Sequence, residues 1–253
     1  MLSVRSLSRA FGGVLAIDDV GFEVRAGHVH AVIGPNGAGK TTLFNLISGI
    51  YLPSAGQVVL EGQDVTGRSP DALARLGVSR TFQNLQVCMN MTAVENVMLG
   101  AHLRLRSGLW TGLLGLARAA DKRLHDESIA LMHYVGIVAH RGAHATQLSF
   151  GTLKRLEIAR ALAAKPRLLL LDEPAAGLND TESREMTGLI RRIADGGVTV
   201  LLVEHDMKMV MTLSDHVVVL DHGRKLADGT PTSVRSDPAV VAAYLGAANE
   251  GDA

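Results

Sequence analysis

A glycine-rich stretch in the N-terminal part of the chain has the spacing of a phosphate-binding loop. Gly34, Gly39, Lys40 and Thr41 occupy the fixed positions of the pattern G-x-x-x-x-G-K-S/T. Glycines let the backbone curl so that N–H groups point at phosphate oxygens, and the lysine supplies positive charge to the β- and γ-phosphates. A threonine hydroxyl at the next position is a ligand for Mg²⁺. The predicted loop comprises Gly34, Pro35, Asn36, Gly37, Ala38, Gly39, Lys40, Thr41 and Thr42.

A pair of acidic residues follows an apolar stretch far downstream. Residues 168–171 are all leucine, and Asp172 and Glu173 come directly after them. In an open α/β sheet, the carboxyl end of a strand lies beside the phosphate loop. We therefore expect Asp172 to hold Mg²⁺ through water, and Glu173 to act as general base toward the attacking water. The loop and the carboxylates together predict that the chain binds and hydrolyses ATP with Mg²⁺.

Apolar patterns predict the elements that position these residues. Alternating or continuously apolar runs indicate strands over 4–11, 16–24, 29–33, 57–60, 168–171, 198–203 and 217–220. A further short strand is expected at Val65, after a turn over 61–64. Helical periodicity indicates helices over 40–50, 181–193 and 207–213. Strands that alternate with helices predict a mainly parallel sheet with crossover helices.

The middle of the chain has a different pattern, which is helical from 91 to 164. One predicted helix face carries Leu124, Leu131, Met132 and Val135. The fold class is therefore α/β: a P-loop core with a mainly parallel sheet, an antiparallel β subdomain and an inserted α-helical subdomain. We expect one domain over 1–253, divided into a nucleotide-binding core (1–86 and 160–230), the helical subdomain (87–159) and a C-terminal helical tail (231–253).

Composition and charge limit the possible functions. Hydrophobic residues make up 47% of the 253 residues, and 25 basic residues balance 25 acidic ones. This composition is typical of a folded globular protein and gives no reason to expect a nucleic-acid partner. The single cysteine, Cys88, excludes an internal disulfide and suits a reducing compartment. No stretch reaches the roughly 18 uninterrupted apolar residues of a membrane span, so we expect the chain not to cross a membrane.

These motifs together resemble those of an ABC-type ATPase, over 11–229. The resemblance rests on the phosphate loop, the strand that ends in Asp-Glu-Pro at 172–174, the stretch Leu-Ser-Phe-Gly-Thr at 148–152, and His205. It implies that 148–152 is the signature motif, in which Ser149 and Gly151 bind the γ-phosphate held by another subunit. Two ATP molecules would then lie between two chains arranged head to tail. Ser149 is also a suitable helix N-cap, and a helix N-terminus favours an anion.

The signature motif departs from the usual family pattern. The family has Gly-Gly-Gln or a close variant after the serine, whereas Phe150, Gly151 and Thr152 follow Ser149 here. Thr152 lacks the longer amide side chain, which puts in doubt any role of that side chain.

The resemblance assigns roles to further residues. Phe11 corresponds to the aromatic residue that stacks on adenine. Gln83 corresponds to the loop glutamine that meets Mg²⁺ and the attacking water and that responds to the membrane partner. His205 corresponds to the histidine that hydrogen-bonds the γ-phosphate. The stretch Ala-Gly-Leu-Asn at 176–179 corresponds to the segment that links the two sites of the dimer, with Asn179 where many relatives have Asp.

Several stretches narrow the resemblance to the first of the two ATPase subunits of bacterial branched-chain amino-acid importers. They are 173–179, 204–211, 153–160, the ending Ala-Tyr-Leu-Gly at 243–246 and the insertion over 103–120. The resemblance implies a second ATPase subunit, two transmembrane permease subunits, and an indirect connection to an extracytoplasmic solute-binding protein. It places the chain at the cytoplasmic face of the inner membrane, as a peripheral subunit. The apolar residues of the insertion are either ordinary lobe core or a surface for the membrane subunits; these are Leu109, Trp110, Leu113, Leu114 and Leu116.

Two other classes of protein share the phosphate loop. One is the ABC ATPases that act on nucleic acid or ribosomes, which usually carry two ATPase domains, a long coiled coil or a basic segment. This sequence has one phosphate loop, no sustained heptads and balanced charge. The other is the P-loop kinases, which would leave 149–152 and His205 without an explanation.

Overall fold

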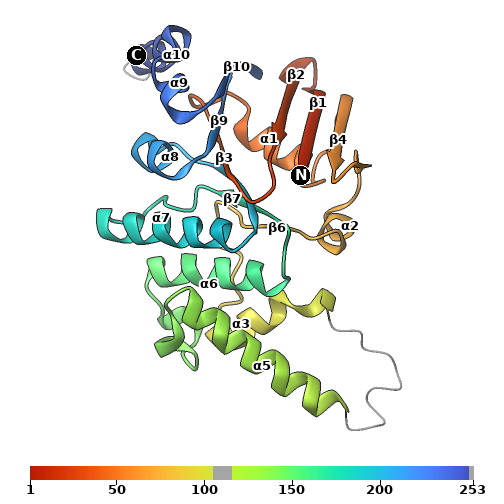
Figure 1. Ribbon diagram of the computed structural model, residues 1–253, viewed down its shortest axis with the longest axis vertical. Coiled ribbons are helices and arrows are strands. Elements are labelled where there is room, and N and C mark those ends of the chain that lie inside the picture. The colour runs from red at the N-terminus through yellow and green to blue at the C-terminus, as the bar shows by residue number, and fades with distance from the viewer. Residues whose placement is uncertain (105–115, 251–253) are drawn as a thin grey trace.

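A six-stranded sheet forms the centre of the molecule (Figure 1). The computed structural model describes residues 1–104 and 116–250. The strand order is β10-β9-β3-β8-β7-β6, and every pair is parallel except β10 with β9. The strands are β3 (Val29–Ile33), β6 (Val78–Arg80), β7 (Leu168–Asp172), β8 (Thr199–Val203), β9 (His216–Asp221) and β10 (Arg224–Gly229).

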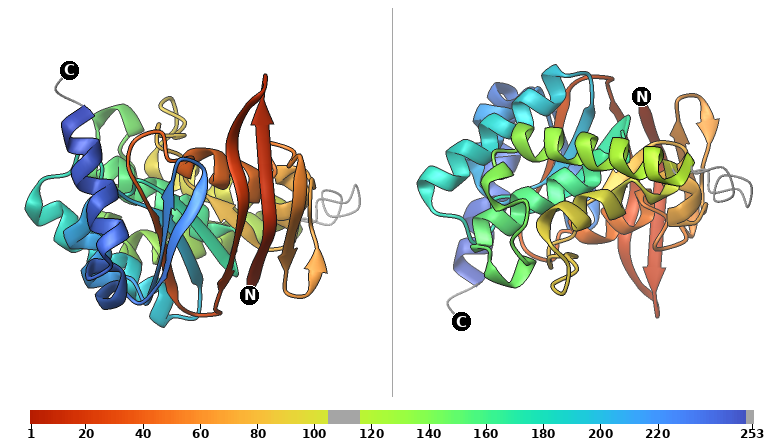
Figure 2. Two further views of the ribbon diagram at one scale, coloured as in Figure 1. Left: turned by 90° about the horizontal axis from the view of Figure 1, so that it is seen from above. Right: turned by 90° about the horizontal axis from the view of Figure 1, so that it is seen from below.

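An antiparallel sheet of four strands, in the order β2-β1-β4-β5, stands beside the central sheet (Figure 2). Its strands are β1 (Leu2–Phe11), β2 (Val14–Val24), β4 (Ala55–Leu60) and β5 (Gln63–Asp64). β1 pairs with both β2 and β4, so that Leu2 lies opposite Val24 on one side and Leu60 on the other. The alternating apolar residues of β1 and β2 are buried on one face of this sheet.

The inner parallel strands β3, β7 and β8 are mainly apolar because both faces of the sheet are covered, one by α1 (Lys40–Ile47) and the antiparallel sheet and the other by helices such as α7 (Asp180–Asp195) and α8 (Met207–Leu213). Every residue of β3, β7 and β8 is buried. Leu168 and Leu170 of β7 pack into the same core cluster as α1, whereas Leu169 and Leu171 pack into the cluster that contains α7 and α8. The period of two along β7 thus divides the core between the two faces.

The helical lobe lies at one end of the molecule, and its long helices pack side by side (Figures 1 and 2). Its helices are α3 (Ala93–Gly100), α5 (Leu116–Tyr134) and α6 (Phe150–Ala163), with 3-10 turns η1 (His102–Arg104), η2 (Val138–His140) and η3 (Ala145–Gln147). The predicted apolar face is confirmed, since Leu124, Met132 and Val135 are buried and Leu131 is partly buried against the same cluster. The insertion residues 109–114 lie outside the described residues, as does the side chain of Leu116.

Both sheets and the helical insertion confirm the predicted fold class. Some local predictions were wrong. Val65 is buried but is not a strand residue, and β5 occupies Gln63–Asp64, where a turn was expected. α1 ends at Ile47 rather than at residue 50, because Gly49 turns the chain with φ 75° where a Cβ atom would lie 2.1 Å from the carbonyl oxygen of Arg68.

Three more elements were not predicted from the sequence. β6 has three residues, too few to show an alternating pattern. β10 is an edge strand of largely polar, partly exposed residues. The third, α2 (Pro70–Arg75), is a single short helix that begins with proline after Ser69.

The last two described elements are the helices α9 (Pro231–Arg235) and α10 (Pro238–Glu250), near the C-terminus (Figure 1). Val234 and Val240 bury their side chains against the central core. None of the described helices is both long enough and apolar enough to span a membrane. The predicted boundary between the helical subdomain and the core, at 159/160, lies within α6. The division of the domain into these subregions stays a prediction.

Replacing a buried strand leucine should destabilise the fold through the cavity that it leaves. Leu201 of β8 is 0% exposed, and Leu201→Ala should lower the free energy of unfolding by about 2–5 kcal/mol. The matched control Leu52→Ala changes a leucine that is 61% exposed and should stay within about 0.5 kcal/mol of the unchanged chain. Urea unfolding followed by circular dichroism measures both. Equal losses in the two variants would contradict the placement of Leu201 in the core.

Candidate functional site

The phosphate loop leaves the end of β3 and leads directly into α1. Two of its glycines are required by close backbone contacts. At Gly34 a Cβ atom would lie 2.1 Å from the carbonyl oxygen of Leu220, and at Gly39, with φ 98°, 2.7 Å from that of Ala16. No other residue type fits these positions without moving the backbone. The strand, loop and helix therefore have the arrangement that a phosphate-binding loop needs.

The ammonium group of Lys40 lies across the mouth of the loop. Its Nζ donates hydrogen bonds to the carbonyl oxygens of Gly34 and Pro35, each at 2.8 Å. Partial burial lowers the pKa of Lys40, and the carboxylate of Glu173 acts in the opposite direction. The lysine is thus held over the curled backbone, where a phosphate group would complete its coordination.

A small polar cavity opens beside the loop. Its volume is about 260 Å³, and its lining is Asn36, Gly37, Ala38, Gly39, Lys40, Thr41, Thr42, Gln83 and Glu173. Gln83 and Glu173, which were predicted to act on the attacking water, therefore line the same cavity as the phosphate loop. The fold thus brings together residues that are 40 and more positions apart in the sequence.

Glu173 lies at the centre of the predicted catalytic residues. Its φ of 48° is in the left-handed region, which costs a non-glycine residue about 1–3 kcal/mol. Its backbone N–H donates to the carbonyl oxygen of Val203 at 3.0 Å. Gln83 donates from Nε2 to Oε2 of Glu173 at 3.1 Å, and Nδ1 of His205 lies 3.9 Å from the same oxygen. The three predicted catalytic side chains thus converge from three different loops.

Asp172 has a different environment from its neighbour. Its side chain is almost fully buried and forms an ion pair with Arg80, whose nitrogen lies 2.8 Å from Oδ2. The same guanidinium donates to Asn45 Oδ1 and Ser48 Oγ at the C-terminal end of α1. Arg80 therefore fixes the direction of the Asp172 side chain, although no sequence pattern singles out this arginine.

The residues predicted to hold Mg²⁺ all carry oxygen donors, and Thr41 and Gln83 line the cavity whereas Asp172 does not. Thr41 offers a hydroxyl, Gln83 an amide oxygen and Asp172 a carboxylate, which are the hard ligands that this ion prefers. In the part of the chain that the structure describes, no cluster of three or more His, Cys, Asp or Glu side chains could hold a metal by itself.

The loop that carries Gln83 rests on a buried carboxylate of the helical lobe. Glu157 of α6 is 5% exposed and accepts hydrogen bonds from the backbone N–H groups of Phe82 and Gln86 at 3.3 and 3.4 Å. Burial raises the pKa of Glu157, although the two N–H groups lower it in part. No local pattern points to this role, because Glu157 lies among apolar helix residues and its partners are 71 and more positions away.

The same loop is held further along by α3. Asn96, which is fully buried, accepts from the backbone N–H of Cys88 at 2.8 Å and donates to the carbonyl oxygen of Cys88 at 3.0 Å. The thiol of Cys88 is free, and its side chain is partly exposed. Two helices of the lobe thus fix both ends of the segment from Gln83 to α3.

Phe11, Ser149 and Gly151 lie in the described part of the chain, but they do not line the cavity. Phe11 ends β1 with 39% of its surface exposed, and its ring contacts Tyr51 edge-on at 5.3 Å between centroids. The guanidinium of Arg9 lies 4.5 Å from the centroid of the same ring. An exposed aromatic face is compatible with stacking, and the role of Phe11 stays a prediction.

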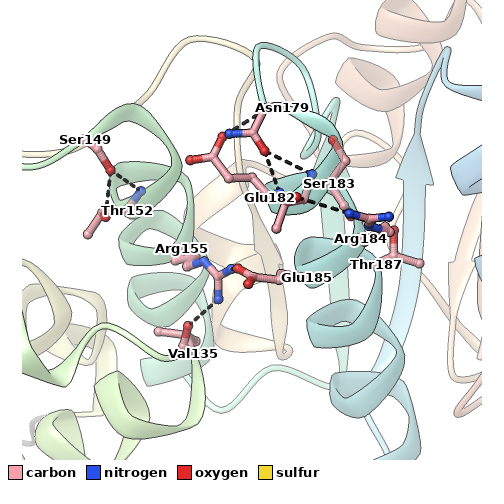
Figure 3. Close-up of polar contacts among 11 residues, drawn as sticks. Val135, Ser149, Thr152, Arg155, Asn179, Glu182, Ser183, Arg184, Glu185 and Thr187 are labelled. Carbon is pink, nitrogen blue, oxygen red and sulfur yellow. Dashed lines mark hydrogen bonds and ion pairs between the residues drawn. The ribbon is translucent and has the colours of Figure 1, made fainter.

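The signature motif begins α6, as Figure 3 shows. Ser149 is the N-cap: its Oγ accepts from the backbone N–H of Thr152 at 3.4 Å and lies 2.9 Å from Oγ1 of Thr152. Gly151 lies against Glu182, so that a Cβ atom there would be 2.5 Å from the carboxylate oxygen. The predicted N-cap is confirmed. Ser149 is exposed toward solvent, where a second chain could reach it.

The fold and the phosphate site together define a P-loop ATPase. Residues 17–176 match a family described as "ABC transporter", and residues 224–249 match one described as "Branched-chain amino acid ATP-binding cassette transporter". The chain therefore belongs to the ABC transporter family, and as a member of its ATP-binding branch it is an ATPase.

Named relatives and solved structures agree with this assignment along the whole chain. The High-affinity branched-chain amino acid transport ATP-binding protein LivG of Escherichia coli K12 is 42% identical, and BraF of Pseudomonas aeruginosa, which has the same description, is 43% identical; each alignment covers 98% of both chains. A crystal structure of the ADP conformation of an ATP-binding cassette of an ABC transporter superimposes with a TM-score of 0.85 at 30% identity, covering 97% of this chain and 98% of that one. These similarities favour a transport ATPase over one that acts on nucleic acid or ribosomes.

The buried carboxylate of Glu157 should make stability depend on pH. Its pKa in the folded state is raised above the ordinary value of 4.5, so its contribution to stability is fully present below pH 4.5 and is lost as pH rises through the folded-state value. Glu157→Gln keeps an acceptor oxygen without the charge. The free energy of unfolding of the unchanged chain should therefore fall relative to that of Glu157→Gln between pH 4 and pH 7.5, as measured by urea unfolding at each pH.

Glu157→Leu is the matched control, because it removes the acceptor together with the charge. Leaving the N–H groups of Phe82 and Gln86 without this acceptor should cost about 1–3 kcal/mol of stability at all pH values. A constant difference between the unchanged chain and Glu157→Gln across the pH range would contradict the raised pKa.

Proposed function

We propose that this chain is the ATP-binding and ATP-hydrolysing subunit of an importer of branched-chain amino acids or related small solutes. The convergence of Gln83, Glu173 and His205 at the phosphate loop supports hydrolysis. The solute class is supported by the printed names of the full-length relatives and by the family match over 224–249.

The residues around the cavity have the following proposed roles. The loop residues 34–42 bind the phosphates through backbone N–H groups, with Lys40 on the β- and γ-phosphates. Glu173 orients the attacking water and accepts its proton, while Gln83 and His205 hold the carboxylate and the γ-phosphate in line. Thr41, Gln83 and, through water, Asp172 would hold Mg²⁺, which supplies positive charge to the transferring phosphoryl group. Phe11 would stack on the adenine ring.

The site requires a second ATPase subunit to be complete. Ser149 and Gly151 begin α6 away from the cavity of their own chain, while Ser149 faces solvent. In a head-to-tail pair, this N-terminus of α6 would face the γ-phosphate bound to the other chain, where its N–H groups favour an anion. The partner is a second copy or a related subunit.

A groove beside Gln83 is the proposed docking place for the two transmembrane permease subunits. Its volume is about 510 Å³ and its lining is mainly apolar, from α2, α3 and α6 together with Arg80 and Phe82. Leu99 on its rim is 40% exposed. An apolar groove of this kind suits a short helix of a partner. The chain would then lie at the cytoplasmic face of the inner membrane, and the extracytoplasmic solute-binding protein would act on it only through the permeases.

Glu173→Gln should separate nucleotide binding from hydrolysis. The amide keeps the shape but cannot accept the proton of the attacking water, so ATP turnover should fall at least a hundredfold while the Kd for ATP changes less than about threefold. Lys40→Ala is the contrasting variant: it removes the charge on the phosphates and should weaken ATP binding at least tenfold. Calorimetry, phosphate release, and uptake of labelled leucine into vesicles that contain the complete transporter measure these effects. Normal turnover in Glu173→Gln would remove the general base from this proposal.

A charge in the groove should disturb docking without affecting the nucleotide site. Leu99→Glu should reduce co-purification with the membrane subunits at least fivefold, because docking would bury the new carboxylate in an apolar groove. Val241→Glu, at a residue of α10 that is 46% exposed, is the matched control. The Kd for ATP of both variants should remain within twofold of the unchanged value. Full co-purification of Leu99→Glu would show that the permeases dock elsewhere.

A further inference from the structure

A lysine with a buried ammonium group lies one turn into the signature helix. Lys154 of α6 is 3% exposed, and its Nζ donates a hydrogen bond to the backbone carbonyl oxygen of Glu173 at 3.2 Å. Lysine is almost never fully buried, because its ammonium loses its hydration shell. Such a residue needs partners that replace water, and here the identified acceptor is the peptide of the general base.

The other surroundings of the ammonium are weaker partners. The ring of Phe150, in the preceding turn of α6, lies 5.7 Å from Nζ, close enough for a cation–π attraction. Glu157 lies one turn further along the helix, and the positive charge of Lys154 partly offsets the burial that raises the pKa of its carboxyl group. Among the residues that the structure describes, no carboxylate forms an ion pair with Lys154 within 4.0 Å. The Glu173 carbonyl is therefore its principal fixed contact.

The two peptide groups that flank the Cα atom of Glu173 are both held by hydrogen bonds, which fix the direction in which its side chain leaves the backbone. The N–H of Glu173 donates to the carbonyl oxygen of Val203. The carbonyl oxygen of Glu173 also accepts from the N–H of Ala176 at 3.2 Å. The residue has φ 48°, a conformation that persists only when its surroundings impose it. The side chain of Lys154 reaches the carbonyl oxygen of Glu173 from the helical lobe.

The first turn of α6 packs against the segment that follows Glu173. The ring of Phe150 covers Gly177, where a Cβ atom would lie 2.9 Å from a ring carbon. Arg155 forms an ion pair with Glu185 of α7 (Figure 3). The start of α6, the segment 173–179 and the start of α7 therefore form one packed unit, and Lys154 lies on the side of this unit that faces the general base.

We propose that Lys154 is a positioning residue that couples the signature motif to the general base of the same chain. This inference rests on the proposed function, since it assumes that Ser149 contacts the γ-phosphate of the partner subunit and that Glu173 activates water at its own site. A phosphate bound at the N-terminus of α6 fixes the helix. Lys154 then holds the Glu173 peptide in the conformation that directs the carboxylate at the attacking water. Closure around one ATP thereby prepares hydrolysis of the other.

The test compares two substitutions in the full-length chain. Lys154→Met has a similar length but no donor and no charge, whereas Lys154→Arg keeps both. Lys122→Met is the matched control, because Lys122 is exposed on α5. Should Lys154→Met fail to fold, Lys154→Gln takes its place, since it removes the charge and shortens the donor while remaining polar. Steady-state ATPase activity gives kcat and KM, calorimetry gives the Kd for ATP, and hydrogen exchange reports on the segment 173–179.

The proposal predicts a loss of turnover without a loss of binding. In Lys154→Met, kcat should fall at least fivefold, the Kd for ATP should change less than threefold, and amide exchange over 173–179 should become faster. Lys154→Arg should recover at least half of the lost kcat, and Lys122→Met should equal the unchanged chain. A smaller fall in kcat, a parallel loss of affinity, unchanged exchange, or no recovery with arginine would overturn the proposal.

The Glu173→Gln variant distinguishes the two levels of inference. If Glu173→Gln loses turnover while Lys154→Met keeps it, the proposed function stands and the role of Lys154 is wrong. If Glu173→Gln keeps turnover, the proposed general base itself is wrong, and the coupling through Lys154 falls with it.

Discussion

The register between three neighbouring parallel strands determines where the phosphate loop, Glu173 and His205 lie. Val203 at the end of β8 is paired with Val32 of β3 on one side and with Asp172 of β7 on the other. Because the strands are parallel, the loops that follow them leave the sheet at the same edge. The phosphate loop follows β3, Glu173 follows β7 and His205 follows β8. A slip of one residue in β7 would exchange the leucines of its two faces and move Glu173 away from the loop, so the packing of the core and the geometry of the site depend on the same pairing.

The second constraint comes from α6, which crosses from the helical lobe to the sheet. Lys154 and Glu157 are three residues apart and therefore lie on neighbouring positions of one helix face. The first donates to the carbonyl oxygen of Glu173, and the second accepts from the N–H groups around Gln83. Both charges are buried, which is costly unless their hydrogen bonds are made. A displacement of α6 relative to the sheet therefore acts on both loops at once.

The sequence was sufficient where the signal is local. The ranges of β3 and α8 were predicted without error, because an apolar run and a helical periodicity are both short-range patterns. The phosphate loop was found through its fixed spacing and the acidic pair through the apolar run before it, whereas Phe11, Gln83 and His205 were found only through family resemblance. The ion pair between Arg80 and Asp172 joins residues 92 positions apart, so no local pattern could reveal it. The short strand β6 and the polar edge strand β10 were missed for the related reason that their pairing, and not their own sequence, defines them.

Cys88 has a practical consequence because of its place in the fold. It lies between Gln83 and α3, its backbone is fixed by Asn96, and its side chain is partly exposed. Since the chain contains no other cysteine, a thiol-directed fluorophore or spin label would attach at this position alone, without any prior mutation. This chain thus carries a single attachment point for spectroscopic probes, in the loop that leads from Gln83 to the helical lobe.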